Sequence, residues 1–99
     1  MVIITENMFP AGSAKDVGKA FLGLPPLPEY ITTKGPYIHS DTERGIRSIL
    51  IYECDNDKLA DALQVVGDRL ANYFDVPGYT YSANVWNEAQ EALKMIGLE

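Results

Sequence analysis

Asn7 and His39 carry the two side chains of this sequence best suited to catalysis. His39 is the only histidine, and an imidazole can transfer protons near neutral pH. The carboxamide of Asn7 can donate to and accept from a bound ligand without ionising. We therefore predict Asn7 and His39 as catalytic residues. As a general base His39 would need Asp41 or Glu43 to orient it through a local turn. Two alternatives stay open: Asn7 as a turn-forming residue at a strand end, and His39 as a surface residue.

Aromatic residues form a second candidate group. Six tyrosines, one tryptophan and three phenylalanines are concentrated in segments that read as strands, and aromatics with polar tips suit the lining of a ligand pocket. We predict Tyr52 and Trp86 as ligand-binding residues, with Arg47 available to hold a ligand carboxylate. The same aromatics would also suit a dimer interface, and Arg47 could instead pair with Glu6 or Glu53.

Neither a metal site nor a cofactor is expected. The sequence Asp55, Asn56, Asp57 begins like a calcium loop, but Leu59 and Ala60 stand where further ligands and a glycine belong. Residues 12–15 open a helix without the spacing of a phosphate-binding loop. Cys54, the only cysteine, follows a strand beside acidic residues, so we expect an inert thiol and no internal disulfide.

Length and charge narrow the function classes. At 99 residues the chain is expected to form one domain, residues 1–99. Its net charge of −6 argues against a nucleic-acid or anionic-membrane partner, which would need clustered cations. The apolar run at residues 2–4 is too short for a signal peptide or membrane span, and the cytoplasm is the expected compartment.

The elements that would position these residues can be read along the chain. Residues 2–9, 30–40, 46–52 and 79–86 are predicted strands, the second interrupted at Gly35 and Pro36 so that it is one kinked strand or two short ones. A helix is expected from Ser13, whose side chain would cap its first turn, to about residue 23. It would carry an apolar stripe of Val17, Ala20, Phe21 and Leu24.

A longer helix is expected to begin at residues 55–57, where Asp55 supplies a capping side chain. Its expected buried face is Leu59, Leu63, Val66, Leu70 and Phe74. A short tail helix, capped by Asn87, ends the chain. The order predicts an α+β fold with a four-stranded antiparallel sheet and two helices on one face.

The expected strands do not alternate strictly between apolar and polar residues. In the third strand Ile46, Leu50 and Tyr52 share one parity, whereas Ile49 and Ile51 share the other. Both faces of the sheet are therefore partly apolar, and two helices can cover only one of them. A second copy of the chain is the expected cover, so we predict a homodimer.

In element order and size, nearly the whole chain resembles the dimeric α/β-barrel superfamily of ferredoxin-like βαββαβ units. Thr5, Glu6 and Asn7 before the helix start at residues 12–16 are similar to the first strand of haem-degrading relatives of the antibiotic-biosynthesis monooxygenases, whose asparagine lies in the haem pocket. Those enzymes bind iron through a histidine on the second helix, and residues 57–75 contain none. The resemblance therefore implies at most a cofactor-independent oxygenase.

The sequence leaves two function classes open. One is a homodimer that binds a small, aromatic molecule or acts as a cofactor-independent oxygenase or isomerase, with Asn7, Tyr52, Trp86 and His39 around one pocket. The other is a non-enzymatic module whose apolar face serves self-association or a protein partner. Substrate, reaction and pathway are not encoded in any motif.

Overall fold

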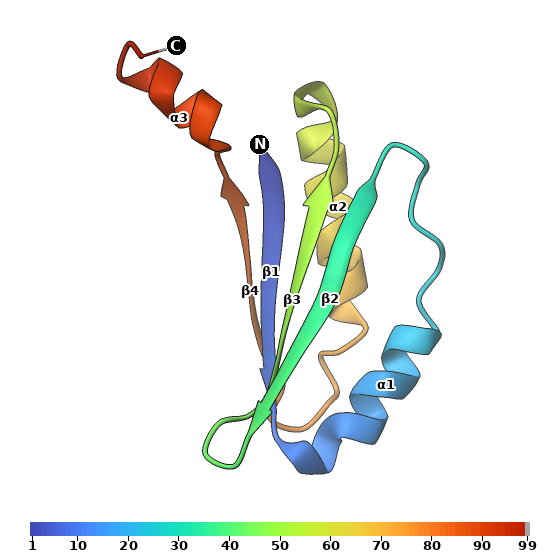
Figure 1. The fold of residues 1–99 in the computed structure, drawn as a ribbon. Coiled ribbons are helices and arrows are strands. Elements are labelled where there is room, and N and C mark those ends of the chain that lie inside the picture. The colour runs from blue at the N-terminus through green and yellow to red at the C-terminus, as the bar shows by residue number, and fades with distance from the viewer. Residues whose placement is uncertain (99) are drawn as a thin grey trace.

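Four strands and three α-helices form in the order predicted from the sequence (Figure 1). The computed structural model describes residues 1–98. The strands are β1 (Val2–Phe9), β2 (Thr32–Asp41), β3 (Gly45–Glu53) and β4 (Thr80–Trp86), and the helices are α1 (Ala14–Leu22), α2 (Leu59–Ala71) and α3 (Ala89–Met95). Short 3₁₀ turns, η1 (Ala11–Ser13) and η2 (Asn56–Lys58), lead into α1 and α2.

The strands make one antiparallel sheet in the order β2-β3-β1-β4. β1 is central, with Ile4 opposite Ile51 of β3 and Asn84 of β4. Its β-branched residues favour this extended pairing. β2 is a single irregular strand whose register shifts between Lys34 and Tyr37, so the segment forms one kinked strand and not two short ones. The strand order and pairing fit a ferredoxin-like arrangement.

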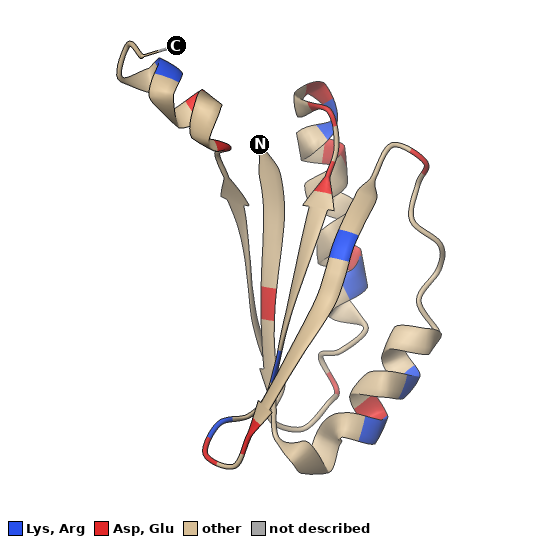
Figure 2. Ribbon diagram, in the orientation of Figure 1, with Lys and Arg blue, Asp and Glu red and all other residues tan. Residues whose placement is uncertain are grey.

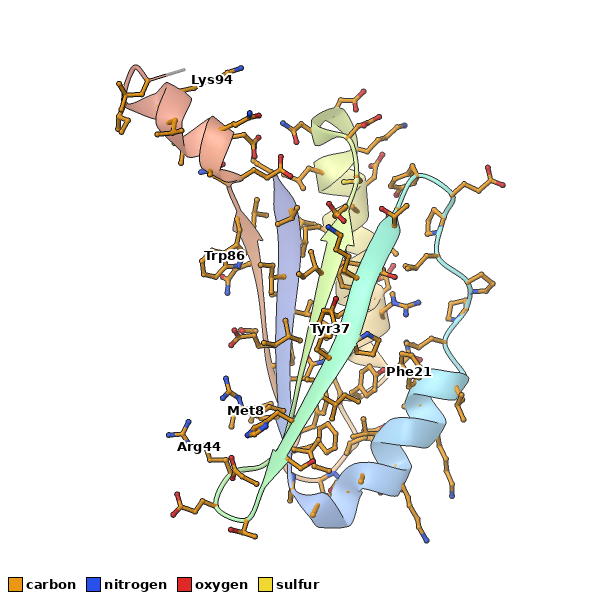
Figure 3. The ribbon with its side chains drawn as sticks, viewed as in Figure 1. Met8, Phe21, Tyr37, Arg44, Trp86 and Lys94 are labelled. Atoms are coloured by element: carbon orange, nitrogen blue, oxygen red, sulfur yellow. The ribbon has the colours of Figure 1, made fainter. Side chains whose placement is uncertain are left out.

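Side-chain alternation gives the sheet two different faces. The face toward α1 and α2, here the helix face, carries Ile3, Thr5, Asn7 and Phe9 of β1 and Ile46, Ser48, Leu50 and Tyr52 of β3. The other, the open face, carries Val2, Ile4, Glu6 and Met8 of β1 and Arg47, Ile49 and Ile51 of β3. Both helices lie on one side (Figure 1), and Met8 and Trp86 point to the other (Figure 3). The prediction of apolar residues on both faces is confirmed.

The core lies between the helix face and α2. Ile3, Ala62 and Val66 are at most 1% exposed and pack with Leu50, Tyr52 and Leu70. The predicted buried face of the second helix was partly wrong. Leu63 is 39% exposed, and Phe74, which lies beyond the end of α2, is 62% exposed. The helix turns a small side chain, Ala62, to the sheet, which allows the two layers to approach closely.

Three predicted helix caps form differently. The hydroxyl of Ser13 does not cap α1 but donates to the carbonyl of Pro77, 2.6 Å away. Asp55 precedes η2 without a side-chain capping bond. The tail helix α3 is capped at Glu88, whose amide donates to the carboxylate of Glu91 at 2.9 Å, and not at Asn87. The predicted local caps at Ser13, Asp55 and Asn87 are therefore wrong.

The start of α3 is held by the amino terminus. The ammonium of Met1 lies 2.7 Å from the Glu91 carboxylate, and Asn56 donates to the same group at 3.1 Å. These hydrogen bonds lower the pKa of Glu91 to about 2. Figure 2 shows most charged residues on helices and loops, with few on the strands. Within residues 1–98 no helix is long and apolar enough to cross a membrane.

Candidate functional site

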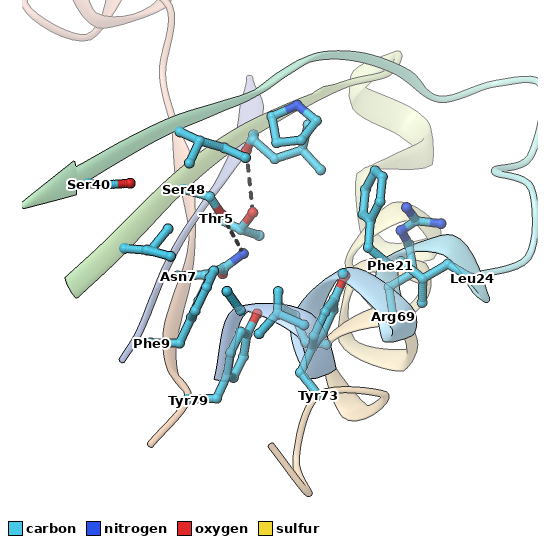
Figure 4. A pocket seen from close by; sticks show the side chains of 18 of the residues that line it. Thr5, Asn7, Phe9, Phe21, Leu24, Ser40, Ser48, Arg69, Tyr73 and Tyr79 are labelled. Carbon is cyan, nitrogen blue, oxygen red and sulfur yellow. Dashed lines mark hydrogen bonds between the residues drawn. The ribbon is translucent and has the colours of Figure 1, made fainter. Parts of the chain in front are cut away.

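A cavity of about 290 Å³ lies between the helix face, α1 and α2 (Figure 4). Most of its wall is apolar, with Phe9, Ile46 and Leu50 from the sheet and Val17 and Phe21 from α1. Its volume is close to the lower end of the range of about 300–1,000 Å³ for small-molecule pockets. A compact molecule of one or two rings would fit such a space.

The cavity exists because α1 stands away from the sheet. No residue of α1 is buried, although its predicted apolar stripe points inward: Val17, Phe21 and Leu24 line the cavity. Figure 3 shows Phe21 directed from α1 toward the sheet. Gly18 also lines the cavity, and a Cβ built on it would meet nothing within 4 Å. The helix therefore covers the cavity without filling it.

One side of the cavity is a stack of aromatic rings. The ring centroids of Tyr73 and Tyr79 are 4.9 Å apart with planes inclined by 10°, and Phe9 stacks on Tyr79 at 6.2 Å and 18°. Burial raises the pKa of Tyr79 well above its ordinary value and raises the pKa of Tyr73 in the same direction. Both phenols therefore stay neutral at physiological pH and can donate a hydrogen bond.

Three buried polar atoms in the residues lining this cavity have no hydrogen-bond partner within residues 1–98: Asn7 Oδ1, Tyr79 OH and Arg69 Nε. Asn7 is oriented by its amide nitrogen, which donates to the Ser48 hydroxyl at 3.2 Å (Figure 4). A buried polar group without a partner costs about 1–3 kcal/mol. Three such atoms around one apolar cavity mark a place where a polar partner from outside the chain would be stabilised.

Arg69 is the only charged residue among the described ones that line the cavity. Its Nη1 donates to the carbonyl of Pro25 at 3.0 Å, which ties α2 to the loop after α1. In Figure 4 its guanidinium lies near Phe21 and Leu24, at the end of the cavity away from Asn7. The cavity therefore has a cationic end and an amide end.

The five residues predicted from the sequence are divided between the two faces of the sheet. Asn7 and Tyr52 line the cavity. Trp86, opposite Val2, and the cross-strand pair His39 and Arg47 lie on the open face. The prediction that Asn7, Tyr52, Trp86 and His39 surround one pocket is therefore wrong for a single chain, because strand parity places the sheet between them.

On the open face, His39 has one of its two predicted partners and Arg47 has neither of its own. His39 Nε2 is 3.8 Å from Asp41 Oδ2, with the two side chains 72% and 37% exposed. Glu53 pairs with Lys34 at 3.5 Å and not with Arg47, which forms no ion pair within residues 1–98. Cys54 is half-buried, and its pKa is raised by burial and by Asp55, which agrees with the expected inert thiol.

Sequence reasoning missed Arg69, Tyr73 and Tyr79 as cavity residues. Arg69 is one position before Leu70 on the long helix, outside the apolar positions that predict its buried face. The spacing of Tyr73 from Val66 and Leu70 is helical and would have indicated an inward direction. No group of three or more potential metal-ligating side chains occurs among residues 1–98.

Comparison with known proteins adds no functional label. No protein-family model matches the chain, and a search of curated proteins finds no similar sequence. The resemblance to the dimeric α/β-barrel superfamily thus stays a prediction. The functional argument rests on the cavity and on the two faces of the sheet.

Proposed function

We propose that this protein binds a small aromatic molecule in the cavity between the sheet and α1. The observation that carries the proposal is the placement of three unpartnered buried polar atoms, on Asn7, Arg69 and Tyr79, around one apolar cavity. Apolar walls with a few polar groups are typical of ligand sites. The stacked rings of Tyr73 and Tyr79 offer a flat surface to an aromatic ligand.

Binding is the activity that the cavity supports best among those left open by the sequence. Within residues 1–98 its wall contains no carboxylate, histidine, cysteine or lysine side chain, the groups that most often transfer protons at neutral pH. A cofactor-independent oxygenase or isomerase would have to rely on Asn7 and on neutral phenols to orient its substrate. Asn7, which the sequence predicts to be catalytic, is therefore proposed to orient the bound ligand.

The test is titration with a neutral two-ring probe, 2-naphthamide. At a modest efficiency of about 0.3 kcal/mol per non-hydrogen atom, a ligand with about 13 such atoms binds with a Kd near 1 mM. We expect saturable binding at or below that concentration by calorimetry, with NMR shifts of the Asn7 side-chain amide and of α1. Absence of saturable binding, or shifts confined to the open face, would contradict the proposal.

We further propose that the protein is a homodimer that pairs through the open face. Seven apolar side chains lie there: Val2, Ile4, Met8, Tyr37, Ile49, Ile51 and Trp86. The radius of gyration, 15.2 Å, exceeds the value of about 13 Å expected for a compact chain of about 100 residues. A thin, one-sided layer of this kind is stabilised by a second layer.

Ile4→Lys tests this pairing, because it places a charge on the open face of the central strand, opposite Ile51 and Asn84, while leaving the cavity untouched. Sedimentation should show a dimer for the original chain and a monomer for the variant, which still binds 2-naphthamide. A monomeric original chain would contradict the dimer. A dimer that persists in Ile4→Lys would show that the chains pair through another surface and would contradict pairing through the open face.

A further inference from the structure

Arg69 gives the cavity a positive charge in a protein that is acidic as a whole. The chain has a net charge of −6, yet the wall of the cavity contains Arg69 as its one charged residue among residues 1–98. The ion pairs of the described residues, Met1 with Glu91, Lys34 with Glu53 and His39 with Asp41, do not include it. A cation beside an apolar space without an acidic partner is stabilised by an incoming anion.

The geometry of the guanidinium favours one kind of anion. Nη1 is occupied by the carbonyl of Pro25, 3.0 Å away, whereas Nε is buried and unpartnered. The Nε edge of a guanidinium presents two parallel N–H groups, from Nε and Nη2, that match the two oxygens of a carboxylate. The contact with Pro25 holds the group in place, so little side-chain freedom is lost when this edge binds a ligand.

The rest of the wall limits the charge and shape of that ligand. A phosphate dianion would bring a second negative charge into a wall with only one cation, and burial of an unpaired charge is strongly unfavourable. The near-parallel rings of Phe9, Tyr79 and Tyr73 provide a stacking surface for a flat body. At the opposite end, Asn7 Oδ1 is free to accept a hydrogen bond from a hydroxyl or amine of the ligand.

We infer that the ligand is a compact aromatic monocarboxylate, with its carboxylate on the Nε edge of Arg69 and its ring against the stacked aromatics Phe9, Tyr73 and Tyr79. This inference rests on the proposed function and specifies it. It assigns Arg69, which no sequence motif marks, as the specificity-determining residue of the cavity.

The experiment compares 2-naphthoate with 2-naphthamide, which differ in charge but hardly in shape. Calorimetric titrations at pH 7 use the original chain, Arg69→Gln and, as matched control, Arg44→Gln. Arg44 lies in the exposed β2–β3 turn and does not line the cavity. A hydrogen bond to a charged group contributes about 1.5–3 kcal/mol, so we expect the carboxylate to bind about tenfold or more tightly than the amide.

Arg69→Gln should abolish this preference, and Arg44→Gln should preserve it. Equal binding of the two probes to the original chain would overturn the inference while leaving the proposed function intact. This comparison uses the original chain alone, so it does not depend on whether a variant folds. Retention of the preference in Arg69→Gln would overturn the assignment of Arg69. If neither probe binds, both the inference and the proposed function fail.

Discussion

Gly18→Leu should fill the cavity from its α1 side and stabilise the protein while blocking the ligand. Gly18 lines the cavity, and a Cβ there has open space around it. Gly67, in the middle of α2, also has open space around a Cβ but does not line the cavity. Gly67→Leu is therefore a matched control for the change of helix propensity alone.

The two substitutions share one contribution to stability and differ in another. Replacing a helical glycine by leucine stabilises by about 0.5–1 kcal/mol at either position, since glycine is the poorer helix former. At Gly18 alone, burial of the new side chain adds about 1.5–3 kcal/mol. A difference of about 2 kcal/mol corresponds to a Tm that is higher by roughly 8–16 °C for Gly18→Leu than for Gly67→Leu.

Thermal and urea denaturation followed by circular dichroism measure that difference, and 2-naphthamide titration measures the block. We expect Gly18→Leu to lose saturable binding and Gly67→Leu to retain it. Equal stabilisation of the two variants would mean that the new leucine lies in solvent. A destabilised Gly18→Leu would mean that the space is too small to accept a side chain. Either result would refute the reasoning that places an open cavity under α1.

Other substitutions test separate parts of the structure. Tyr79→Phe removes a buried hydroxyl without a partner, so urea denaturation should show unchanged stability or a gain of up to about 1 kcal/mol, and a clear loss would reveal a missed partner. The pKa of Glu91 is lowered from 4.5 to about 2, so its contact with the Met1 ammonium stabilises the position of α3 fully above pH 4.5 and is lost as the pH falls toward 2. NMR shifts of α3 should follow this pH dependence, and Glu91→Gln should remove the pH dependence. Gly45→Ala should cost about 1–3 kcal/mol of unfolding free energy, because Gly45 has a φ of +79° and its Cβ would lie 2.6 Å from the Phe9 carbonyl oxygen; an unchanged Tm would contradict this.

The strands were predictable because their signals are local. The β-branched and apolar run at residues 2–9 coincides with β1, and the polar turn before Gly45 ends at the start of β3. Successive side chains of a strand point to opposite faces of the sheet, so a continuous apolar run predicts apolar residues on both faces. The face of α2 could not be predicted in this way. The helix carries apolar residues on more than one side, and packing against the sheet selected Ala62 over Leu63.

The candidate site was only half predictable, because it depends on register. Asn7 and Tyr52 lie on the helix face, and Asn7 is directly opposite Ser48. The register that places Asn7 opposite Ser48 depends on how whole strands pair in the sheet, and no local segment of the sequence determines it. His39 differs from Ile38 by one position, and that single step moves its side chain from the helix face to the open face. The bulge between Lys34 and Tyr37 shifts the register of this strand, so parity counted along the sequence could not identify its face.

The residues that were predicted from the sequence to share one pocket thus belong to two surfaces, which suit different kinds of partner. The cavity on the helix face is small, and its unpartnered atoms on Asn7, Arg69 and Tyr79 call for a polar group on a small molecule. The open face is broad and partly apolar, with Trp86 at one edge, and it is the surface proposed to pair with a second copy of the chain. Because the sheet separates them, occupation of one surface need not depend on occupation of the other. Under the two proposals, ligand binding and pairing of chains are therefore independent of each other.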